Sequence, residues 1–487
     1  MTEQIDDSLE KRVGKNSLAI YAARAANLGI NLFVFVYLAN YLGERSYGRL
    51  SFALTYIGFF DIIVNAGCNQ ILVRELARGE LLRDRVLGTG FVLRAATLVV
   101  GVLASWLGIF ALGYPREVVW LVMIVSANLL LSSRIASGRS LFETVYQADL
   151  RMYFPMALVL LDNMIFLLLV IWRTRHGAGL LEIGVLYTLA NLGGFLLLAF
   201  RFFRENRLWW GFDGPLARYF LKQAVPVMLY LGFSNLNTRL DVLLVSLLRG
   251  DAEVGLYTSA TRLVLPLTLF SMAITMSLYP VYSRAYRRDS HLFEIVLRTG
   301  TKLLVALGVG LGFGLFFNAQ WIYQFLYRPE YAGAVEAFRL LVIAVAFIFL
   351  TFYFVEVLIG TGHQHLATVT MILVLAANVG LNLMLIRRFG FIGAAYTRLA
   401  TAGLSATLFL LMVFFATGVN LARDWLRMAG LTAIYGSLAY LLRDWNPFVQ
   451  LPILGLSLLF LSLVGPYFRP DERQLLRRFI GFKTTTA

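Results

Sequence analysis

Six basic side chains lie inside apolar stretches of the sequence, where a charge is costly unless the protein neutralises or uses it. They are Arg24, Arg94, Arg239, Arg262, Lys302 and Arg398. A cation in the middle of a bilayer costs about 2.5–3.5 kcal/mol even on a lenient insertion scale, so such residues face the protein interior or a wet cavity. The planar fork of arginine donates two hydrogen bonds at once, which suits phosphate or pyrophosphate. The pattern therefore predicts a cationic cavity for an anionic ligand.

Two asparagines accompany the first of these arginines. Asn27 and Asn31 follow Arg24 at helical spacing on one face, and we expect all three to line the cavity wall. Arg24 lies about 10 Å past the start of its apolar stretch. A long side chain snorkels part of that distance to the membrane surface, so an interfacial Arg24 without a ligand is the competing interpretation.

Four acidic residues lie at comparable depth and could serve as partners or as carriers of a coupling proton. They are Asp61, Asp162, Asp241 and Glu356. Asp241 is only two residues from Arg239 and projects from nearly the opposite side of a helix, so it is a poor direct partner. Six cations against four anions leave a positive excess. The competing interpretation is that individual pairs are purely structural.

The composition identifies an integral membrane protein. Of 487 residues, 59% are hydrophobic and 15% charged, and the mean hydropathy is +0.72. Apolar stretches of about 20 residues recur, the length with which a helix crosses about 30 Å of hydrocarbon. We predict an all-α fold with fourteen transmembrane helices: 17–42, 50–73, 86–112, 117–138, 154–172, 182–203, 219–248, 255–283, 292–317, 335–360, 366–386, 391–416, 425–442 and 448–467.

The placement of basic residues predicts the orientation. The N-terminus, every second loop and the tail together carry well over twice as many lysines and arginines as the opposite loops, which places both termini in the cytoplasm. The net charge of +15 is therefore interpreted as a topology signal, with no nucleic-acid partner. The tail at 469–482 mixes arginines with Leu475, Leu476 and Phe479, as in a short helix on the membrane surface. A loosely ordered basic terminus is the alternative.

Two short segments repeat at an offset of 207 residues. "GERSYGRLSFA" begins at Gly43 and "GDAEVGLYTSA" at Gly250, so that Gly48 matches Gly255. Six predicted helices separate them, which indicates two pseudo-symmetric six-helix lobes, as in alternating-access transporters that bind cargo between their lobes. The predicted domains are a cytoplasmic N-terminus at 1–16, an N-lobe at 17–217, a C-lobe at 218–417, two extra C-terminal helices at 418–467 and a cytoplasmic amphipathic tail at 468–487.

The sequence contains no convincing motif for an enzyme active site or a metal site. "GVGLGFG" at 308–314 superficially resembles a phosphate loop, but it lies inside an apolar run and is better interpreted as close helix packing. His363 and His365 are two histidines in a short loop without further ligands, so no metal site is expected. Cys68 is the single cysteine and forms no disulfide within the chain. We predict no catalytic residues and no cofactor.

The motifs together resemble a known family. They are "YLGERSYGRLSFA" (41–53), "NQILVRELAR" (69–78), the stretch from Ala224 to Leu263 and "RRFGFIGAAYTRLAT" (387–401). The sequence resembles the Wzx-like polysaccharide flippases of the multidrug/oligosaccharidyl-lipid/polysaccharide exporter superfamily, over nearly the whole chain. The resemblance implies two six-helix lobes plus two helices, a cationic central cavity and a functional arginine at the position of Arg24.

The resemblance also implies a function and its partners. Members move undecaprenyl-pyrophosphate-linked oligosaccharides from the cytoplasmic to the periplasmic leaflet of the bacterial inner membrane, for O-antigen of lipopolysaccharide and other surface polysaccharides. The expected partners are this lipid-linked glycan, membrane lipids, a polysaccharide polymerase and a chain-length regulator. A proton or sodium gradient, or the membrane potential, would supply direction.

Three other functions remain as alternatives. Lipid II flippases of the same superfamily also have fourteen helices and an arginine in the first. A multidrug/cation antiporter predicts a cavity dominated by acidic residues and activity without helices 13 and 14. A membrane glycosyltransferase or polymerase predicts a large outer loop with catalytic residues, whereas the longest outer loop predicted here is 318–334.

Overall fold

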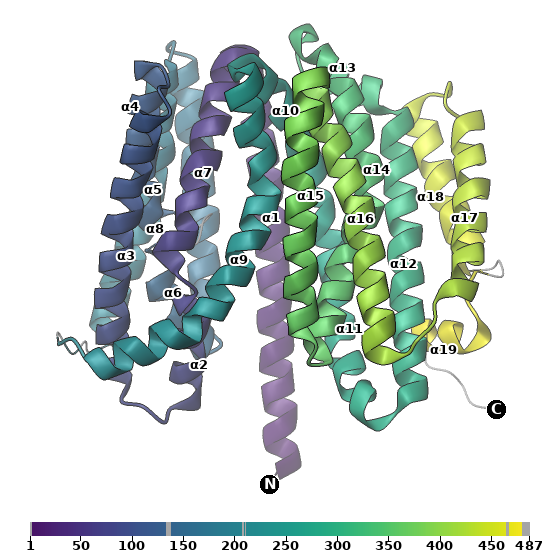
Figure 1. Ribbon diagram of the computed structural model, residues 1–487, viewed down its shortest axis with the longest axis horizontal. Coiled ribbons are helices and arrows are strands. Elements are labelled where there is room, and N and C mark those ends of the chain that lie inside the picture. Colours follow the sequence, from purple (N-terminus) through teal and green to yellow (C-terminus); the bar gives the residue numbers. More distant parts are fainter. Residues whose placement is uncertain (1, 133–137, 207–208, 210, 464–466, 480–487) are drawn as a thin grey trace. The chain divides into compact units, whose positions relative to one another are not determined.

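The computed structural model describes residues 2–132, 138–206, 209, 211–463 and 467–479. Within these ranges every regular element is a helix (Figure 1). The described parts of all fourteen predicted spans fall largely on helices, while residues 133–137 of the fourth span, 464–466 of the fourteenth and 480–487 of the tail lie outside the described residues. Nine helical segments of the described chain are long and apolar enough to cross a membrane. The all-helical membrane architecture is confirmed, whereas the number of fourteen crossings stays a prediction.

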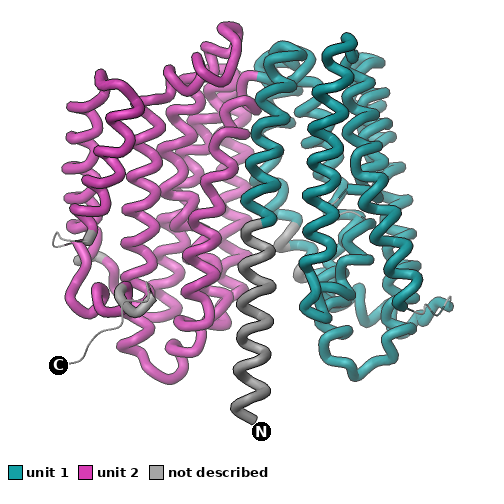
Figure 2. The backbone as a smooth tube through the Cα atoms, turned by 180° about the vertical axis from the view of Figure 1, so that it is seen from behind, with its two compact units in different colours: residues 1–255 teal, residues 256–487 magenta. Residues whose placement is uncertain are grey.

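The chain forms two compact units, residues 1–255 and 256–487 (Figure 2). The predicted lobe boundary lies earlier, between residues 217 and 218. The helix that follows this boundary, α9 (Gly214–Arg249), packs against α1 (Thr2–Asn65), α2 (Cys68–Arg78) and α3 (Arg83–Ala111), and is therefore part of the first unit. The division into pseudo-symmetric lobes stays a prediction.

Glycines and caps set the helix bounds in the first unit. A kink at Gly43, which has φ 73°, divides α1 into the first predicted span and part of the second. Ala66 and Gly67 take positive φ and separate α1 from α2. At the start of α9 the Asp213 carboxylate accepts a hydrogen bond from Leu216 N at 3.0 Å, an N-cap. The remaining helices of this unit are α4 (Arg116–Ser126), α5 (Asn128–Leu131), α6 (Ser140–Ala148), α7 (Tyr153–Thr174) and α8 (Leu180–Glu205).

The second unit is built around α14 (Ala334–Gly360), which packs against α11 (Thr268–Arg288), α12 (Ser290–Phe317) and α16 (Phe391–Thr417). Pro266 lies in a short 3₁₀ turn, Leu265–Leu267, which breaks the predicted eighth span into α10 (Asp251–Val264) and α11. The other helices are α13 (Ala319–Leu326), α15 (Gln364–Phe389), α17 (Ala422–Leu441), α18 (Pro447–Leu463) and α19 (Pro470–Phe479), with a 3₁₀ turn at Pro329–Gly333.

The glycine-rich stretch of α12 is a packing surface, as predicted. A Cβ at Gly308 would lie 2.6 Å from the Cα of Ala346 on α14. A Cβ at Gly310 would overlap the side chain of Leu458 on α18. Two faces of one helix thus use glycine to approach two different neighbours closely.

The two repeated segments pack against each other within the first unit, and each contributes a glycine to the contact. A Cβ at Gly48 would overlap the carbonyl oxygen of Asp251, and a Cβ at Gly255 would overlap the carbonyl oxygen of Glu44. The offset of 207 matches Gly48 with Gly255 and Glu44 with Asp251. Each of the two contacts therefore pairs the glycine of one repeat with the acidic residue of the other. Gly43 and Gly250 precede the two segments with similar backbone angles, φ 73° and 93° with ψ 168° and −175°. The sequence repeat therefore corresponds to a local structural repeat.

Replacement of a packed glycine tests this crossing. Gly48→Ala forces a methyl group onto the backbone of residue 251 and should destabilise the protein by about 1–3 kcal/mol. Gly29→Ala is the control, because a Cβ at Gly29 meets nothing within 4 Å and alanine favours a helix. Thermal unfolding in detergent should show a lower midpoint for the first variant and an equal or higher midpoint for the second. Equal midpoints for both variants would contradict the close crossing.

Candidate functional site

The Arg239 side chain lies next to Asp61 and is only partly buried. Arg239 Nη2 lies 3.4 Å from Asp61 Oδ2, and Asn235 Nδ2 donates to Asp61 Oδ1 at 3.2 Å. The Asp61 side chain is 4% exposed, whereas that of Arg239 is 24% exposed. A Cβ at Gly58 would overlap the Arg239 guanidinium. The absence of a side chain at Gly58 therefore leaves the space on α1 that the guanidinium occupies. The arrangement holds the guanidinium against α1 while part of the side chain remains accessible.

Arg94 has a different environment. It is buried and donates hydrogen bonds to the backbone carbonyl of Val64 and to the side-chain oxygens of Asn65 and Asn69. Val64 belongs to the last turn of α1, whose carbonyls have no partner further along the helix. A cation at a helix C-terminus also meets the negative end of the helix dipole. Arg94 therefore joins α3 to the break between α1 and α2.

The residues predicted to share a face with Arg24 are partly tied to a neighbouring helix. Arg24 is exposed, whereas Asn27 is buried and accepts a hydrogen bond from Asn163 Nδ2 on α7 at 2.5 Å. Asn31 Nδ2 donates to the carbonyl of Asn27 at 2.8 Å. The structure thus brings the two asparagines together and leaves Arg24 at the surface of its unit.

Asp162 forms a buried ion pair that sequence reasoning did not foresee. Arg139 Nη1 lies 2.5 Å from Asp162 Oδ2, and both side chains are essentially inaccessible. Gly194 N donates to the other oxygen, Oδ1, at 3.0 Å. Arg139 Nε also lies 3.4 Å from Glu143 Oε1, so one guanidinium serves two carboxylates. The sequence analysis had counted Arg139 only as a basic loop residue.

Lys302 lies at the centre of a buried cluster in the second unit. Its ammonium, with 0% exposure, is 2.8 Å from Asp424 Oδ1 and 2.8 Å from both carboxylate oxygens of Glu472. Arg298 also contacts Asp424, and Arg469 N donates to Glu472 Oε2 at 2.7 Å. Within this structure the charge of Lys302 is neutralised by α17 and by the tail helix α19. We refer to Arg298, Lys302, Asp424, Arg469 and Glu472 as the tail cluster.

The tail is therefore docked by a specific contact, which the basic amphipathic pattern did not predict. Tyr467, just before α19, is buried and donates a hydrogen bond from its hydroxyl to the carbonyl of Lys302 at 2.6 Å. The described part of the tail forms the helix that was predicted, but the buried Glu472 attaches it to α12. Arg469 adds a second attachment, because its Nη2 lies 3.5 Å from Asp424 Oδ1 on α17.

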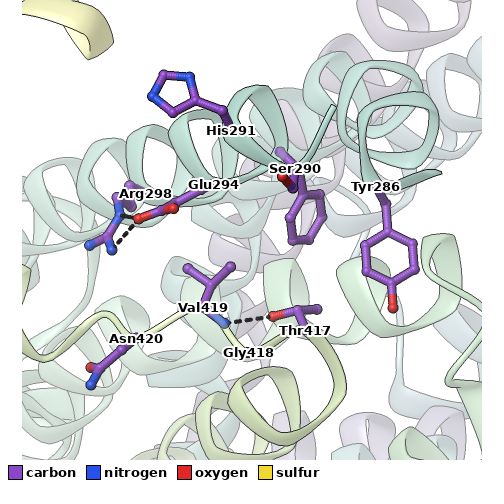
Figure 3. A pocket seen from close by; sticks show the side chains of 10 residues that line it. Tyr286, Ser290, His291, Glu294, Arg298, Thr417, Gly418, Val419 and Asn420 are labelled. Atoms are coloured by element: carbon purple, nitrogen blue, oxygen red, sulfur yellow. Dashed lines mark hydrogen bonds and ion pairs between the residues drawn. The ribbon is translucent and has the colours of Figure 1, made fainter. Parts of the chain in front are cut away.

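A polar cavity of about 540 Å³ lies where the turn before α12 meets the loop after α16 (Figure 3). Arg298 and Glu294 line one side, joined by an ion pair, and the backbone of Gly418–Asn420 lies opposite. Because Arg298 also contacts Asp424, it connects this cavity to the tail cluster.

The remaining predicted site residues belong to different helices. Arg262 on α10 and Arg398 on α16 are half-buried, as is Glu356 on α14, while Asp241 on α9 is buried. None of these four is part of the tail cluster or of the Arg139 and Asp162 pair.

A long apolar groove runs along the second unit. It has a volume of about 890 Å³ and lies between α12, α14 and α17. Gly308 and Gly312 line it on α12, and Gly436 lines it on α17. Lys302 and Asp424 of the tail cluster lie within one turn of the groove residues Val305 and Trp425, so the cluster joins α12 to α17 near one end of the groove.

Removal of one charge tests the tail cluster. Glu472→Gln leaves Lys302 buried with only Asp424 beside it, and should lower the free energy of unfolding by about 2 kcal/mol. Asp471→Asn, one residue earlier and outside the cluster, should leave it unchanged. Thermal midpoints of the two variants in detergent measure the difference. A wild-type midpoint for Glu472→Gln would show that the contact does not hold the tail.

The Glu143 carboxyl predicts a pH dependence of stability. Burial raises the pKa of Glu143 to about 7, Arg139 opposes the rise and Asp162 adds to it. Because this pKa is higher in the folded than in the unfolded state, its contribution to stability is present at low pH and is lost as the pH rises from about 4.5 through 7. Raising the pH from 5 to 8 should therefore destabilise wild type more than Glu143→Gln, by about 2 kcal/mol. If the unfolding midpoints of wild type and Glu143→Gln changed with pH in parallel, Glu143 would not be the source of the pH dependence.

Comparison with known proteins identifies the family. The model of the family described as polysaccharide biosynthesis protein matches residues 13–286, more than half of the chain. A second family model, MatE, matches residues 226–384. A search of curated protein sequences finds no match.

Solved structures share the fold at low sequence identity. The lipid II flippase MurJ in an inward closed conformation is 16% identical with a TM-score of 0.73, and the match covers 95% of this chain and 99% of MurJ. A multidrug resistance MATE family transporter in an inward-facing conformation is 17% identical with a TM-score of 0.65, covering 81% and 94%. A transporter of the MOP superfamily from Pyrococcus furiosus is 16% identical with a TM-score of 0.62, covering 84% and 96%.

The fold and the family models agree with the resemblance predicted from the motifs. The chain belongs to the polysaccharide biosynthesis protein family, within the multidrug/oligosaccharidyl-lipid/polysaccharide exporter superfamily.

Proposed function

We propose that this protein moves a polyprenyl-pyrophosphate-linked oligosaccharide from the cytoplasmic to the periplasmic leaflet of a bacterial inner membrane, for O-antigen or another surface polysaccharide. The main support for this proposal is the environment of the Arg239 side chain. This guanidinium lies within an apolar helix and is oriented by Asp61 and Gly58, yet 24% of the side chain remains accessible. A fixed, accessible guanidinium suits a diphosphate, because it donates paired hydrogen bonds to phosphate oxygens.

The cations of the sequence prediction divide by environment. Lys302 and Arg94 are buried among partners, and in this structure they hold the protein together. Arg24 is exposed and Arg239 is half-buried in the first unit, and Arg262 and Arg398 are half-buried in the second. We assign the recognition of the pyrophosphate to the two arginines of the first unit, with Asn31 as a polar neighbour for the glycan; for Arg262 and Arg398 this role stays a prediction from the sequence.

The apolar groove supplies a place for the lipid part of the substrate. A polyprenyl chain is a long, unbranched series of apolar isoprene units, and the groove between α12, α14 and α17 is lined mainly by apolar residues and glycines. Because such a chain leaves lipid rather than water, van der Waals packing against the groove would hold it there. We propose that the chain lies in this groove or beside it while the head group crosses.

Transport by alternating access needs binding that differs between two states. Gly43 and Gly250 provide backbone positions with positive φ at the start of the two repeated segments, where a change of helix direction is inexpensive. A proton or sodium gradient, or the membrane potential, would set the direction. Asp61, which pairs with an accessible arginine, is the carboxylate we assign to such coupling; the enclosed Asp162 is the alternative.

Transport of lipid II is the second candidate function. The likeness to MurJ over 95% of the chain supports it, and lipid II offers the same polyprenyl pyrophosphate chemistry. The family model supports a surface polysaccharide instead. Neighbouring genes for glycosyltransferases would favour the polysaccharide, and neighbouring genes for the cell wall would favour lipid II.

Complementation of a strain that lacks its polysaccharide flippase tests the proposal. Arg239→Ala and Arg24→Ala should each abolish polymer formation at normal protein level, because both remove an accessible cation. Arg239→Lys keeps the charge but not the paired donors, so we expect reduced activity. Gly58→Ala keeps the arginine but displaces it from Asp61 and should resemble Arg239→Ala.

The matched control is Arg249→Ala. Arg249 lies on the same helix, near its end, and pairs with Glu253 at the surface. This variant should keep wild-type activity. Full activity of both Arg24→Ala and Arg239→Ala would remove the cationic site from the mechanism.

A further inference from the structure

A cavity of about 530 Å³ lies at one end of the helix pair α7 and α8, away from the residues assigned to transport. Phe154 from the first turn of α7 forms one wall. Leu197, Phe200, Arg201, Arg204 and Glu205 from the last two turns of α8 form the others. Aromatic and aliphatic side chains thus meet two arginines at a helix end, which is the depth at which lipid head groups lie.

The cavity contains more positive than negative side chains. The Arg201 guanidinium stacks over the ring of Phe154 at 4.3 Å, and Arg201 Nε donates to Glu205 Oε1 at 2.6 Å. Arg204 is exposed and makes no hydrogen bond or ion pair with the described residues. Glu205 is the single carboxylate against two arginines, so the cavity keeps one positive charge. An anion is the ligand that such a site favours.

Apolar side chains continue from the cavity along the outer face of α8. Leu189, Leu196, Leu197 and Phe200 are each at least half exposed. The spacing of seven residues from Leu189 to Leu196 and of four from Leu196 to Phe200 places them on one face of the helix. From Phe200 to Leu189 this stripe is about 16 Å long, comparable to most of an acyl chain. The neighbouring helix α7 presents a matching stripe: Leu161, Met164 and Leu168. A ligand with an anionic head and two apolar chains fits both features.

At the opposite end of the same helix pair, Arg173 at the end of α7 pairs with Glu182 at the start of α8, and Arg175 is exposed, so the predicted orientation in the membrane distinguishes the two ends. The positive-inside pattern places the Arg204 end at the cytoplasmic leaflet, which carries anionic lipids. Charge and position therefore select the same class of ligand.

We propose that this cavity binds an anionic phospholipid, with the phosphate between Arg201 and Arg204 and the acyl chains along the exposed stripes of α7 and α8. The site involves no residue of the proposed transport site and does not depend on the proposed function. A zwitterionic lipid would cover the same apolar stripes and offer the same phosphate, but its cationic amine would cancel the negative charge and leave the positive charge of the cavity uncompensated.

Titration of the purified full-length protein in detergent with phosphatidylglycerol or phosphatidylcholine tests the site, with the thermal unfolding midpoint as the readout. Phosphatidylglycerol should raise the midpoint of wild type at lower concentration than phosphatidylcholine does. Arg204→Gln should weaken the apparent affinity for phosphatidylglycerol about fivefold, and the double variant Arg201→Gln/Arg204→Gln should weaken it further. Both variants should weaken the response to phosphatidylcholine less than the response to phosphatidylglycerol.

Arg175→Gln is the control, because Arg175 is an exposed arginine at the other end of α7. It should keep the wild-type affinity for phosphatidylglycerol. An equal loss of affinity in Arg175→Gln would overturn the site, as would an unchanged affinity in the double variant. A shift of the midpoint by inorganic phosphate as large as that by phosphatidylglycerol would also overturn it, because the ligand would then be a soluble anion.

Discussion

A charge inside a bilayer needs a partner, a hydrogen-bond acceptor or water, and much of this structure answers that requirement. Arg94 meets it with the carbonyl of Val64 at a helix end and with asparagine oxygens. Lys302 meets it with two carboxylates, and Asp162 meets it with Arg139. These contacts join α3 to the break between α1 and α2, α17 and α19 to α12, and the segment before α6 to α7. The same charges that are costly in lipid therefore act as specific links between helices.

Arg239 differs from Arg94 and Lys302 because its side chain is only partly enclosed. Asp61 orients its guanidinium at 3.4 Å, but part of the side chain stays accessible. An ion pair that is fully enclosed cannot exchange its partner for a ligand, whereas a half-open one can when the ligand offers more charge than a carboxylate. A pyrophosphate does so. In the proposed function, the hydrocarbon of the substrate is assigned to the apolar groove of the second unit or to the lipid beside it.

Local patterns in the sequence predicted the helices and the repeat, because each is encoded over a few neighbouring residues. Gly48 and Gly255 could be matched by a constant offset, and the structure shows them in a reciprocal contact. The partners of Lys302 could not be predicted, because Asp424 and Glu472 lie 122 and 170 residues further along the chain and no spacing rule connects them. Arg139 was missed for a related reason: it lies outside the apolar runs, so its burial had no signal in hydropathy.

The most direct test of this account is the affinity of the purified protein for polyprenyl pyrophosphate and for the polyprenyl alcohol of the same chain length. The two ligands share the hydrocarbon and differ only in the diphosphate. The account predicts that the pyrophosphate binds about tenfold more tightly or better, and that Arg239→Ala reduces this preference while binding of the alcohol persists. Equal affinity for the two ligands in wild type would contradict it.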